Sequence, residues 1–252
     1  MGRQVLAAAL QDKEIRVVGG VGEPGLAEVG TDLGTLAGLN PIGIAAVDHL
    51  ESVIDEADTL VEFTLPRVTI EHVRLATQRK KPIVIGTTGF DAEQLAEVRQ
   101  AADKIPVLLS PNMSVGINLL LKLVPLVARA LGQGYDIEIV EAHHRMKRDA
   151  PSGTALKLAE VIAEALDVEF GQVATYGRQG IAPRAEGEIG IHAVRGGGIV
   201  GDHKVIFVND SEQIEITHRA FSRQTFALGA IRAAKFIAHQ SPGLYSMLDV
   251  LS

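Results

Sequence analysis

The segment from Glu141 to Thr154, EAHHRMKRDAPSGT, concentrates the side chains best suited to chemistry. It contains two adjacent histidines, His143 and His144, and then Lys147. An imidazole exchanges protons near neutral pH, and an ammonium group can donate one to a reacting atom. Adjacent residues on a strand point to opposite faces, so the two histidines can serve one site only if the chain turns beside them.

The end of this segment predicts a site for an anion. Pro-Ser-Gly-Thr is typical of a helix start, where the backbone N–H groups of Gly153 and Thr154 have no partners within the helix. These groups and the positive end of the helix dipole favour a carboxylate. Histidine pairs and capped helix starts are each common in ordinary proteins. An imidazole, an ammonium group and an anion site within one short segment together indicate a reduction site for an anionic substrate.

A zinc site made by Glu141, His143 and His144 is the alternative interpretation of the same residues. The corresponding function would be a metal-dependent hydrolase. Because neighbouring strand side chains diverge, this interpretation is disfavoured and no metal site is predicted.

The first half of the chain alternates short apolar segments with helical patterns. A helix is expected at residues 2–11 and a buried strand at 15–21. Further strands are expected at residues 59–64, 82–88 and 106–112, and helices at 66–80 and 92–104. Pro66 suits the first turn of one helix, and Asp91 with Gln94 forms a capping box for the other. Strands separated by helices predict a parallel sheet with helices on both faces.

The second half has a different pattern. A long helix is expected at residues 113–131, kinked or restarted at Pro125, and another at 154–166. Strands are expected at residues 136–144, 188–197, 199–210 and 211–221, and a last helix at 225–240. The later strands lack intervening helices, which predicts an antiparallel or mixed sheet packed on one or two helices. A parallel α/β half followed by an α+β half is the two-domain layout of many dehydrogenases.

Composition limits the possible partners and locations of the 252-residue chain. There is no cysteine, which excludes disulfides, thiolate metal sites and a cysteine nucleophile. The net charge of −7, the scattered basic residues and the absence of tryptophan argue against nucleic acid as a partner. No uninterrupted apolar stretch reaches the roughly 18 residues of a membrane span, and the apolar run near the N-terminus is too short for a signal peptide. A cytoplasmic protein with a small-molecule substrate and no membrane partner is expected.

The N-terminus departs from the usual order of a dinucleotide-binding unit, which opens with a strand, a glycine-rich turn and a helix. Here the helix follows Met1 directly, so Gly2 can be the last glycine of such a turn. Either the domain starts with a helix, or its first strand and turn precede Met1. Glu23 is the acidic residue nearest the end of the strand expected at 15–21, where a carboxylate would bind ribose hydroxyls. A solvated loop glutamate is the alternative interpretation.

The string EAHHRMKRDAPSGTA resembles the signature segment of the dihydrodipicolinate reductases, also called 4-hydroxy-tetrahydrodipicolinate reductases. Other motifs of the family follow in order: FTLPRVTIEH at 63–72, VIGTTGF at 84–90, SPNMSVGIN at 110–118, IGIHAVRGG at 189–197, IVGDH at 199–203 and EITHRAFSRQTFALGA at 215–230. The resemblance therefore covers nearly the whole chain, and a long ungapped signature is more specific than any glycine pattern.

The resemblance implies an α/β fold with a Rossmann-like dinucleotide-binding domain and an α+β substrate domain that has an open mixed sheet. The first domain would contain residues 1–113 and 224–252, and the second, residues 114–223, would bind substrate and form a homotetramer. The implied activity is the reduction of 4-hydroxy-tetrahydrodipicolinate to tetrahydrodipicolinate by NADH or NADPH, in lysine and diaminopimelate biosynthesis.

The family's catalytic and substrate-binding positions fall within the chemical segment described first. The resemblance implies that His143 is the general acid/base and that Lys147 is the proton donor. It implies that His144 and the backbone amides of Gly153 and Thr154 bind a substrate carboxylate.

The cofactor positions implied by the resemblance lie in the first half of the chain. The backbone at Gly86, Thr87, Thr88, Ser110, Pro111, Asn112 and Met113 would line the nicotinamide. Met1 and Glu23 are expected to contact the rest of the dinucleotide. Glycines that directly follow a strand lie where parallel sheets present ligand-binding loops, although GTTG is also typical of a simple strand-to-helix turn.

Three departures from the family pattern concern the cofactor rather than the chemical segment. The opening glycine motif is reduced to Met1, Gly2 and Arg3, the acidic ribose position falls on Gly22 beside Glu23, and Leu65 stands where some members have a basic residue. The choice between NADH and NADPH therefore stays open. A second hypothesis is a truncated or degenerate family member that binds dicarboxylate but lacks reductase activity.

Overall fold

The chain forms two units, and the second is inserted into the sequence of the first. The computed structural model describes residues 1–252. The first unit contains Met1–Val115 and Arg223–Ser252, and the second contains Gly116–Ser222. The first unit therefore depends on two stretches of chain that are separated in sequence by the whole of the second.

A four-stranded parallel sheet lies at the centre of the first unit, in the order β1-β2-β3-β9. Its strands are β1 (Leu60–Glu62), β2 (Ile83–Ile85), β3 (Pro106–Leu109) and β9 (Gly243–Tyr245). Every neighbouring pair is parallel. The first three strands lie within the predicted segments but are shorter, and β9 comes from the end of the chain, where no strand was predicted.

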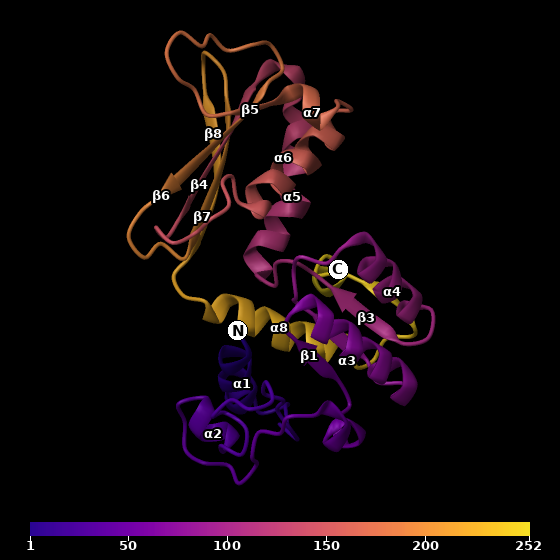
Figure 1. Ribbon diagram of the computed structural model, residues 1–252. Helices are drawn as coiled ribbons and strands as arrows, with labels where there is room; N and C mark the ends of the chain where they lie inside the picture. Colours follow the sequence, from indigo (N-terminus) through magenta and orange to yellow (C-terminus); the bar gives the residue numbers. More distant parts are fainter. The chain divides into compact units, whose positions relative to one another are not determined.

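Helices cover both faces of this sheet, which confirms the predicted Rossmann-like α/β arrangement. They are α1 (Gly2–Gln11), α3 (Pro66–Arg79), α4 (Ala92–Ala102) and α8 (Gln224–Ile237). Strand side chains alternate between faces, so Ile83 and Ile85 pack with α3 and α4, whereas Val84 packs with α1 and α8. Figure 1 shows α8, in yellow, beside α1, in indigo.

Local sequence signals set the ends of α3 and α4. Pro66 occupies the first turn of α3, where its missing N–H would have no helical partner. Asp91 caps α4: its side chain accepts a hydrogen bond from Gln94 N at 2.8 Å, and the Gln94 side chain accepts one from Asp91 N at 3.1 Å. The predicted capping box is therefore confirmed, and both helices lie within the predicted ranges.

The strand predicted at residues 15–21 is wrong. The segment makes a single isolated bridge, from Val21 to Val47. A strand needs a continuous ladder of backbone hydrogen bonds to a neighbour, and no strand lies alongside this segment. Ile15 and Val17 instead pack, partly buried, against the core formed by α1 and α8. The apolar run therefore indicated burial correctly but not pairing.

The second unit contains a five-stranded mixed sheet in the order β5-β6-β4-β7-β8. Its strands are β4 (Asp136–His143), β5 (Ala174–Tyr176), β6 (Ile189–Arg195), β7 (Gly201–Val208) and β8 (Gln213–Ala220). β4 pairs with β6 in parallel and with β7 in antiparallel orientation. The predicted mixed sheet is confirmed, although the short strand β5 was not predicted.

Two helices, α5 (Val115–Leu131) and α6 (Gly153–Ala165), pack on one face of this sheet (Figure 1). Ile137 and Ile139 of β4 point into the same core as Val205 and Phe207 of β7, because inward and outward side chains alternate along each strand. Because α6 packs on this face, its first residues lie beside the end of β4.

Helix α5 continues through Pro125, so the predicted restart does not occur. By length and composition alone, the segment Val115–Gly134 could cross a membrane, although it carries Lys122 and Arg129. The expectation that no segment is apolar enough to span a membrane is therefore not met by this helix. Its residues Leu120, Val124 and Ala128 pack into the core of the second unit, and 28% of the most apolar part of the segment is buried.

Short elements complete the two units. They are α2 (Leu33–Leu36), α7 (Phe170–Val173) and the 3₁₀ turns η1 (Leu50–Ser52), η2 (Ile54–Glu56), η3 (Gly132–Gly134) and η4 (Asp249–Leu251).

Candidate active site

Strand β4 places Glu141 and His143 on the same face of the sheet, because residues two apart on a strand point in the same direction. The strand ends at His143, and a turn follows at once. In this turn Lys147 N donates a hydrogen bond to His144 O at 3.1 Å. The turn that two adjacent histidines require to serve one site is therefore present.

Glu141 is a carboxylate with no exposed side-chain surface, and it accepts four hydrogen bonds. Two come from the Arg195 guanidinium, at 2.8 and 2.7 Å. The others come from Ser152 N at 2.9 Å and His143 Nδ1 at 2.6 Å. Burial alone would raise the pKa of Glu141, but these hydrogen bonds outweigh burial and lower the pKa below its ordinary value. Glu141 is therefore an ionised acceptor near neutral pH.

The ionised Glu141 sets the tautomer of His143. A carboxylate can only accept, so His143 Nδ1 carries the proton of their hydrogen bond. Burial lowers the pKa of His143, the Glu141 carboxylate offsets this in part, and the nearby charges of Lys147 and Arg195 lower the pKa further. The imidazole is therefore neutral near pH 7, and Nε2 keeps its lone pair. A β-carbon added at Gly201 would lie 3.1 Å from Nε2, so this glycine leaves room for the ring.

The start of α6 lies beside this pair and is held from two sides. Ser152 caps the helix through its Oγ, which accepts from Ala155 N at 3.2 Å. The same Oγ lies 3.1 Å from Nε2 of His203 on β7. Burial lowers the pKa of His203 to about 3, so His203 is neutral. Gly153, the first residue of the helix, is exposed and offers its amide to an anion.

Lys147 supplies the positive charge of the site. Its ammonium lies 2.9 Å from a carboxylate oxygen of Asp149 and is largely covered. It is close enough to His143 to lower the pKa of that imidazole. The structure thus brings together His143, Lys147 and the start of α6 within the second unit, and His144 lies between the first two in the turn.

The cofactor positions predicted in the first unit lie on two loops at one edge of the parallel sheet. One loop, Gly86 to Gly89, follows β2, and the other, Ser110 to Met113, follows β3. Carboxyl ends of adjacent parallel strands meet at one edge, and Ser110 N donates to Ile85 O at 3.0 Å. Both loops therefore lie at the edge where parallel sheets bind ligands.

Each loop is held close by packing. A β-carbon at Gly86 would lie 2.2 Å from the ring of Phe63, so only glycine fits there. Buried Thr87 shares a hydrogen bond of 2.8 Å with Thr69 of α3. A β-carbon at Gly229 of α8 would lie 1.7 Å from Met113 O, so the helix backbone lies against the second loop. These rigid, glycine-bearing loops fit a bound nicotinamide ring.

The two remaining cofactor residues lie elsewhere in the first unit. Met1 is the residue directly before α1. Glu23 is exposed on a turn just after the Val21 bridge. Arg3 donates a hydrogen bond of 2.6 Å to Glu28, which ties α1 to that turn.

Sequence reasoning assigned no role to Arg195, Ser152 or His203, although each contacts the site. Arg195 and His203 lie within the motifs IGIHAVRGG and IVGDH, and the register of the sheet aligns Arg195 with His143 and His203 with Glu141. The only available signal was that polar residues occupy inward positions of predicted strands, where apolar ones are the norm.

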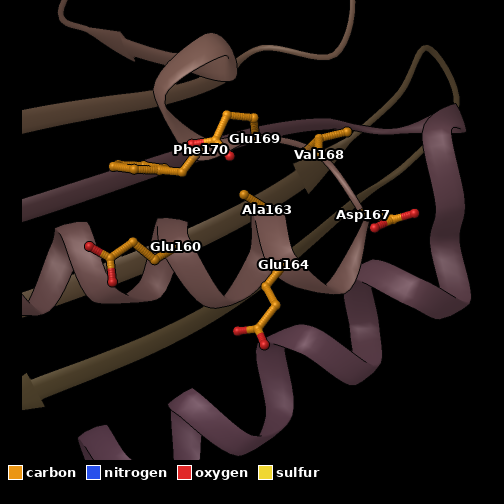
Figure 2. Close-up of a pocket in the computed structure, with 7 residues that line it drawn as sticks. All are labelled: Glu160, Ala163, Glu164, Asp167, Val168, Glu169 and Phe170. Carbon is orange, nitrogen blue, oxygen red and sulfur yellow. The ribbon is translucent and has the colours of Figure 1, made fainter.

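A hollow of about 520 Å³ in the second unit lies away from these residues. Figure 2 shows its lining at the C-terminal end of α6 and the following turn: Glu160, Ala163, Glu164, Asp167, Val168, Glu169 and Phe170. It contains none of the predicted site residues. A carboxylate-rich lining also suits an anionic substrate poorly.

The parallel sheet with its glycine-bearing loops, and the imidazole and ammonium group beside a helix start, define a two-unit α/β oxidoreductase. A family model described as "Dihydrodipicolinate reductase, N-terminus" matches residues 1–113, and one described as "Dihydrodipicolinate reductase, C-terminus" matches residues 116–251. The chain belongs to the dihydrodipicolinate reductase family.

Curated relatives and a solved structure agree with this assignment. The chain is 56% identical over 252 residues to a 4-hydroxy-tetrahydrodipicolinate reductase of Rubrobacter xylanophilus, covering 100% of the chain and 94% of the relative. It is 49% identical to the enzyme of that name from Chromohalobacter salexigens, with the same coverage. A dipicolinate-bound dihydrodipicolinate reductase from Paenisporosarcina sp. TG-14 matches with a TM-score of 0.76 and 25% identity, covering 97% of this chain and 92% of that one.

Proposed function

We propose that this chain reduces 4-hydroxy-tetrahydrodipicolinate to tetrahydrodipicolinate with NADH or NADPH, a step of lysine and diaminopimelate biosynthesis. One observation carries the proposal: a neutral imidazole, an ammonium group and the start of helix α6 lie together in the second unit of a family member. Relatives named for this reaction match over the whole chain.

The substrate is a dicarboxylate, and the start of α6 is where we expect one carboxylate to bind. The backbone amides of Gly153 and Thr154 are the donors, and the helix dipole adds a favourable positive potential. His144 and Lys147 flank the same segment, so either can contact the carboxylate. Ser152, held by Glu141 and His203, keeps the helix start in place.

The substrate loses its 4-hydroxyl group as water, which leaves a conjugated ring, and the reduced nicotinamide, when bound, would supply a hydride to that ring. Lys147 then holds, at Nζ, the proton that neutralises the negative charge pushed through that ring. His143 assists because its unprotonated Nε2 can accept a proton while Nδ1 stays bonded to Glu141. Burial of the pair excludes water that would compete for these protons.

The first unit would hold the cofactor through backbone at Gly86, Thr87 and Thr88 and at Ser110, Pro111, Asn112 and Met113. Met1 and Glu23 would contact the remainder of the dinucleotide. Residues 1–113 and 224–252 are thus proposed as the dinucleotide-binding domain, and residues 114–223 as the substrate-binding domain. Comparing turnover with NADH and with NADPH would identify the preferred cofactor.

The proton-transfer roles are tested by Lys147→Ala and His143→Ala, assayed by nicotinamide oxidation and by cofactor binding. We expect turnover to fall by about 10²-fold or more, with little change in cofactor affinity. Lys157→Ala is the matched control, since Lys157 is an exposed lysine of α6 that pairs with Glu160. Equal losses of turnover and cofactor binding would contradict these roles.

A homotetramer built through the mixed sheets of the second unit, and a cytoplasmic location, are also part of the proposal. The outer face of that sheet is covered by no helix within the second unit, which supports assembly there. Analytical ultracentrifugation of the purified chain tests the tetramer, and cell fractionation tests the location. A monomer at micromolar concentration would contradict the assembly.

A further inference from the structure

We propose that Glu141 is a positioning residue that holds the acid–base imidazole and the substrate-binding helix start in one fixed arrangement. This inference rests on the proposed function and deepens it. Glu141 itself contacts no substrate, since its side chain has no exposed surface. Its effect reaches the reaction through His143 on one side and through Ser152 on the other.

The first observation is that every acceptor position of Glu141 is used by a different part of the site. Oε1 accepts from Ser152 N and from Arg195, and Oε2 accepts from His143 Nδ1 and from Arg195. The donors come from the end of β4, from β6 and from the residue before α6. One carboxylate therefore joins the end of β4, the end of β6 and the residue before α6.

The second observation concerns the imidazole. Because an ionised Glu141 can only accept, the neutral His143 carries its proton on Nδ1 and presents the lone pair of Nε2. Nε2 makes no hydrogen bond within the second unit, and Gly201 leaves it uncovered. Glu141 thus determines which nitrogen is available for proton exchange.

The third observation concerns the helix start. The bond from Ser152 N to Glu141 fixes the residue directly before Gly153, so it sets where the amide of Gly153, at the start of α6, points. Arg195 strengthens this arrangement, since its Nη2 also donates to Asp149 O at 2.7 Å in the preceding loop. Substrate orientation and imidazole orientation therefore depend on the same buried charge.

Glu141→Gln provides a specific test because glutamine has nearly the same shape. Its amide nitrogen is a donor, so it must face His143 Nδ1 or another donor group. If it faces His143, the neutral ring must keep its proton on Nε2 and lose the free lone pair there. A purely structural role for Glu141 would not require this change of tautomer.

The test combines ¹⁵N NMR of the imidazole, steady-state kinetics over pH and calorimetric binding of dipicolinate. For the wild type we expect the Nδ1–H tautomer of His143. For Glu141→Gln we expect NMR to show the Nε2–H tautomer of His143. We expect kcat to fall by about 10²-fold or more and the acidic limb of its pH profile to shift. We also expect weaker binding of dipicolinate. Glu138→Gln is the matched control, on the same strand but the opposite face, and it should leave kcat within about twofold.

Two results would overturn the proposal. One is an Nε2–H tautomer of His143 in the wild-type protein, which needs no variant and so is independent of whether Glu141→Gln folds. The other is an active wild type whose folded Glu141→Gln variant keeps its kcat and pH profile. A wild type that neither oxidises nicotinamide with this substrate nor binds dipicolinate would instead overturn the proposed function, and with it the role given to Glu141.

Discussion

Each unit of the molecule contains a buried glutamate bonded to Nδ1 of a histidine, yet the two pairs differ in charge. In the first unit Glu62 of β1 lies 2.5 Å from His72 of α3, and in the second Glu141 lies 2.6 Å from His143. Burial lowers the pKa of His72, but the bond to Glu62 outweighs burial and raises that pKa above its ordinary value. The pKa of His143 is lowered. The geometry of the pairs is nearly the same, but the pKa of the imidazole is shifted in opposite directions.

The surroundings explain the difference. Apart from His72, the Glu62 carboxylate accepts from Thr64, whose backbone N lies at 2.8 Å, and the nearby Glu51 and Glu71 also favour a charged imidazole. Glu141 is shared with Arg195 and Ser152, and cationic neighbours oppose a second positive charge on the ring. A histidine–carboxylate pair therefore becomes a charged structural link or a neutral proton-exchange group according to what else contacts the carboxylate.

The largest expected effect is on turnover, and it separates the two histidines. His143→Gln should lower kcat by about 10²- to 10⁴-fold, because the proton-exchanging nitrogen is lost. His72→Gln retains a donor to Glu62 and should cause no comparable loss. Steady-state nicotinamide oxidation measures both, and similar losses in the two variants would contradict the distinction.

The next effect is on stability, and it tests whether Glu62 and His72 form an ion pair. His72→Leu should lower the free energy of unfolding by about 3 kcal/mol, because a buried carboxylate loses its partner. The double variant with Glu62→Gln should recover part of the loss, as measured by urea denaturation at pH 6. The pKa of His72 is raised in the folded protein, so His72 contributes to the free energy of unfolding at pH values below its unfolded pKa. This contribution is lost as the pH rises through the folded pKa.

His203 should show the opposite dependence on pH. Its folded pKa is lowered from 6.5 to about 3, so acid protonates it in the unfolded chain first and stability falls as pH falls below 6.5. At about 1.4 kcal/mol per pKa unit, it should contribute roughly 2 kcal/mol of the stability lost between pH 7 and pH 5. Its charged or titratable neighbours are His143, Glu141, His218 and Lys147. Chemical denaturation at both pH values measures this contribution.

The matched comparison uses two histidine variants. His203→Asn should remove that contribution while keeping a polar partner for Ser152, whereas His239→Asn, at an exposed position, should not. Equal acid sensitivity of His203→Asn and the wild type would show that His203 is not held neutral.

The smallest expected effect is on kcat, and it comes from placing a methyl group next to the imidazole of His143. A methyl group at Gly201 would lie 3.1 Å from His143 Nε2, so Gly201→Ala should lower kcat by several-fold, at a cost of about 1 kcal/mol in stability or less. Gly196→Ala is the control, since a β-carbon there meets no atom within 4 Å. A kcat for Gly201→Ala equal to that of the control would mean that Nε2 is not the working nitrogen.

Local signals made part of this structure predictable. The residues His143, Lys147 and Gly153 lie within one short segment, and a capping serine and a turn suffice to bring them together. Helices α3 and α4 were predicted well for the same reason, since Pro66 and the Asp91 capping box act within a single turn.

The parts that sequence reasoning missed depend on pairing between distant segments. Arg195 reaches Glu141 only because β6 pairs in parallel with β4, and His203 only because β7 pairs with β4 on the other side. The segment 15–21 has a strand-like composition but no neighbouring strand to pair with. Periodicity indicates which residues are buried, whereas the register between strands decides which of them meet.

The discontinuity of the first unit has a consequence for biosynthesis. Helix α8, whose backbone lies against Met113 O at Gly229, and strand β9 are made after the entire second unit. While the ribosome is still translating, the loop after β3 lacks its support and the parallel sheet lacks an edge. The inserted unit, whose residues are contiguous, can fold first, so the segment made earliest reaches its final form last.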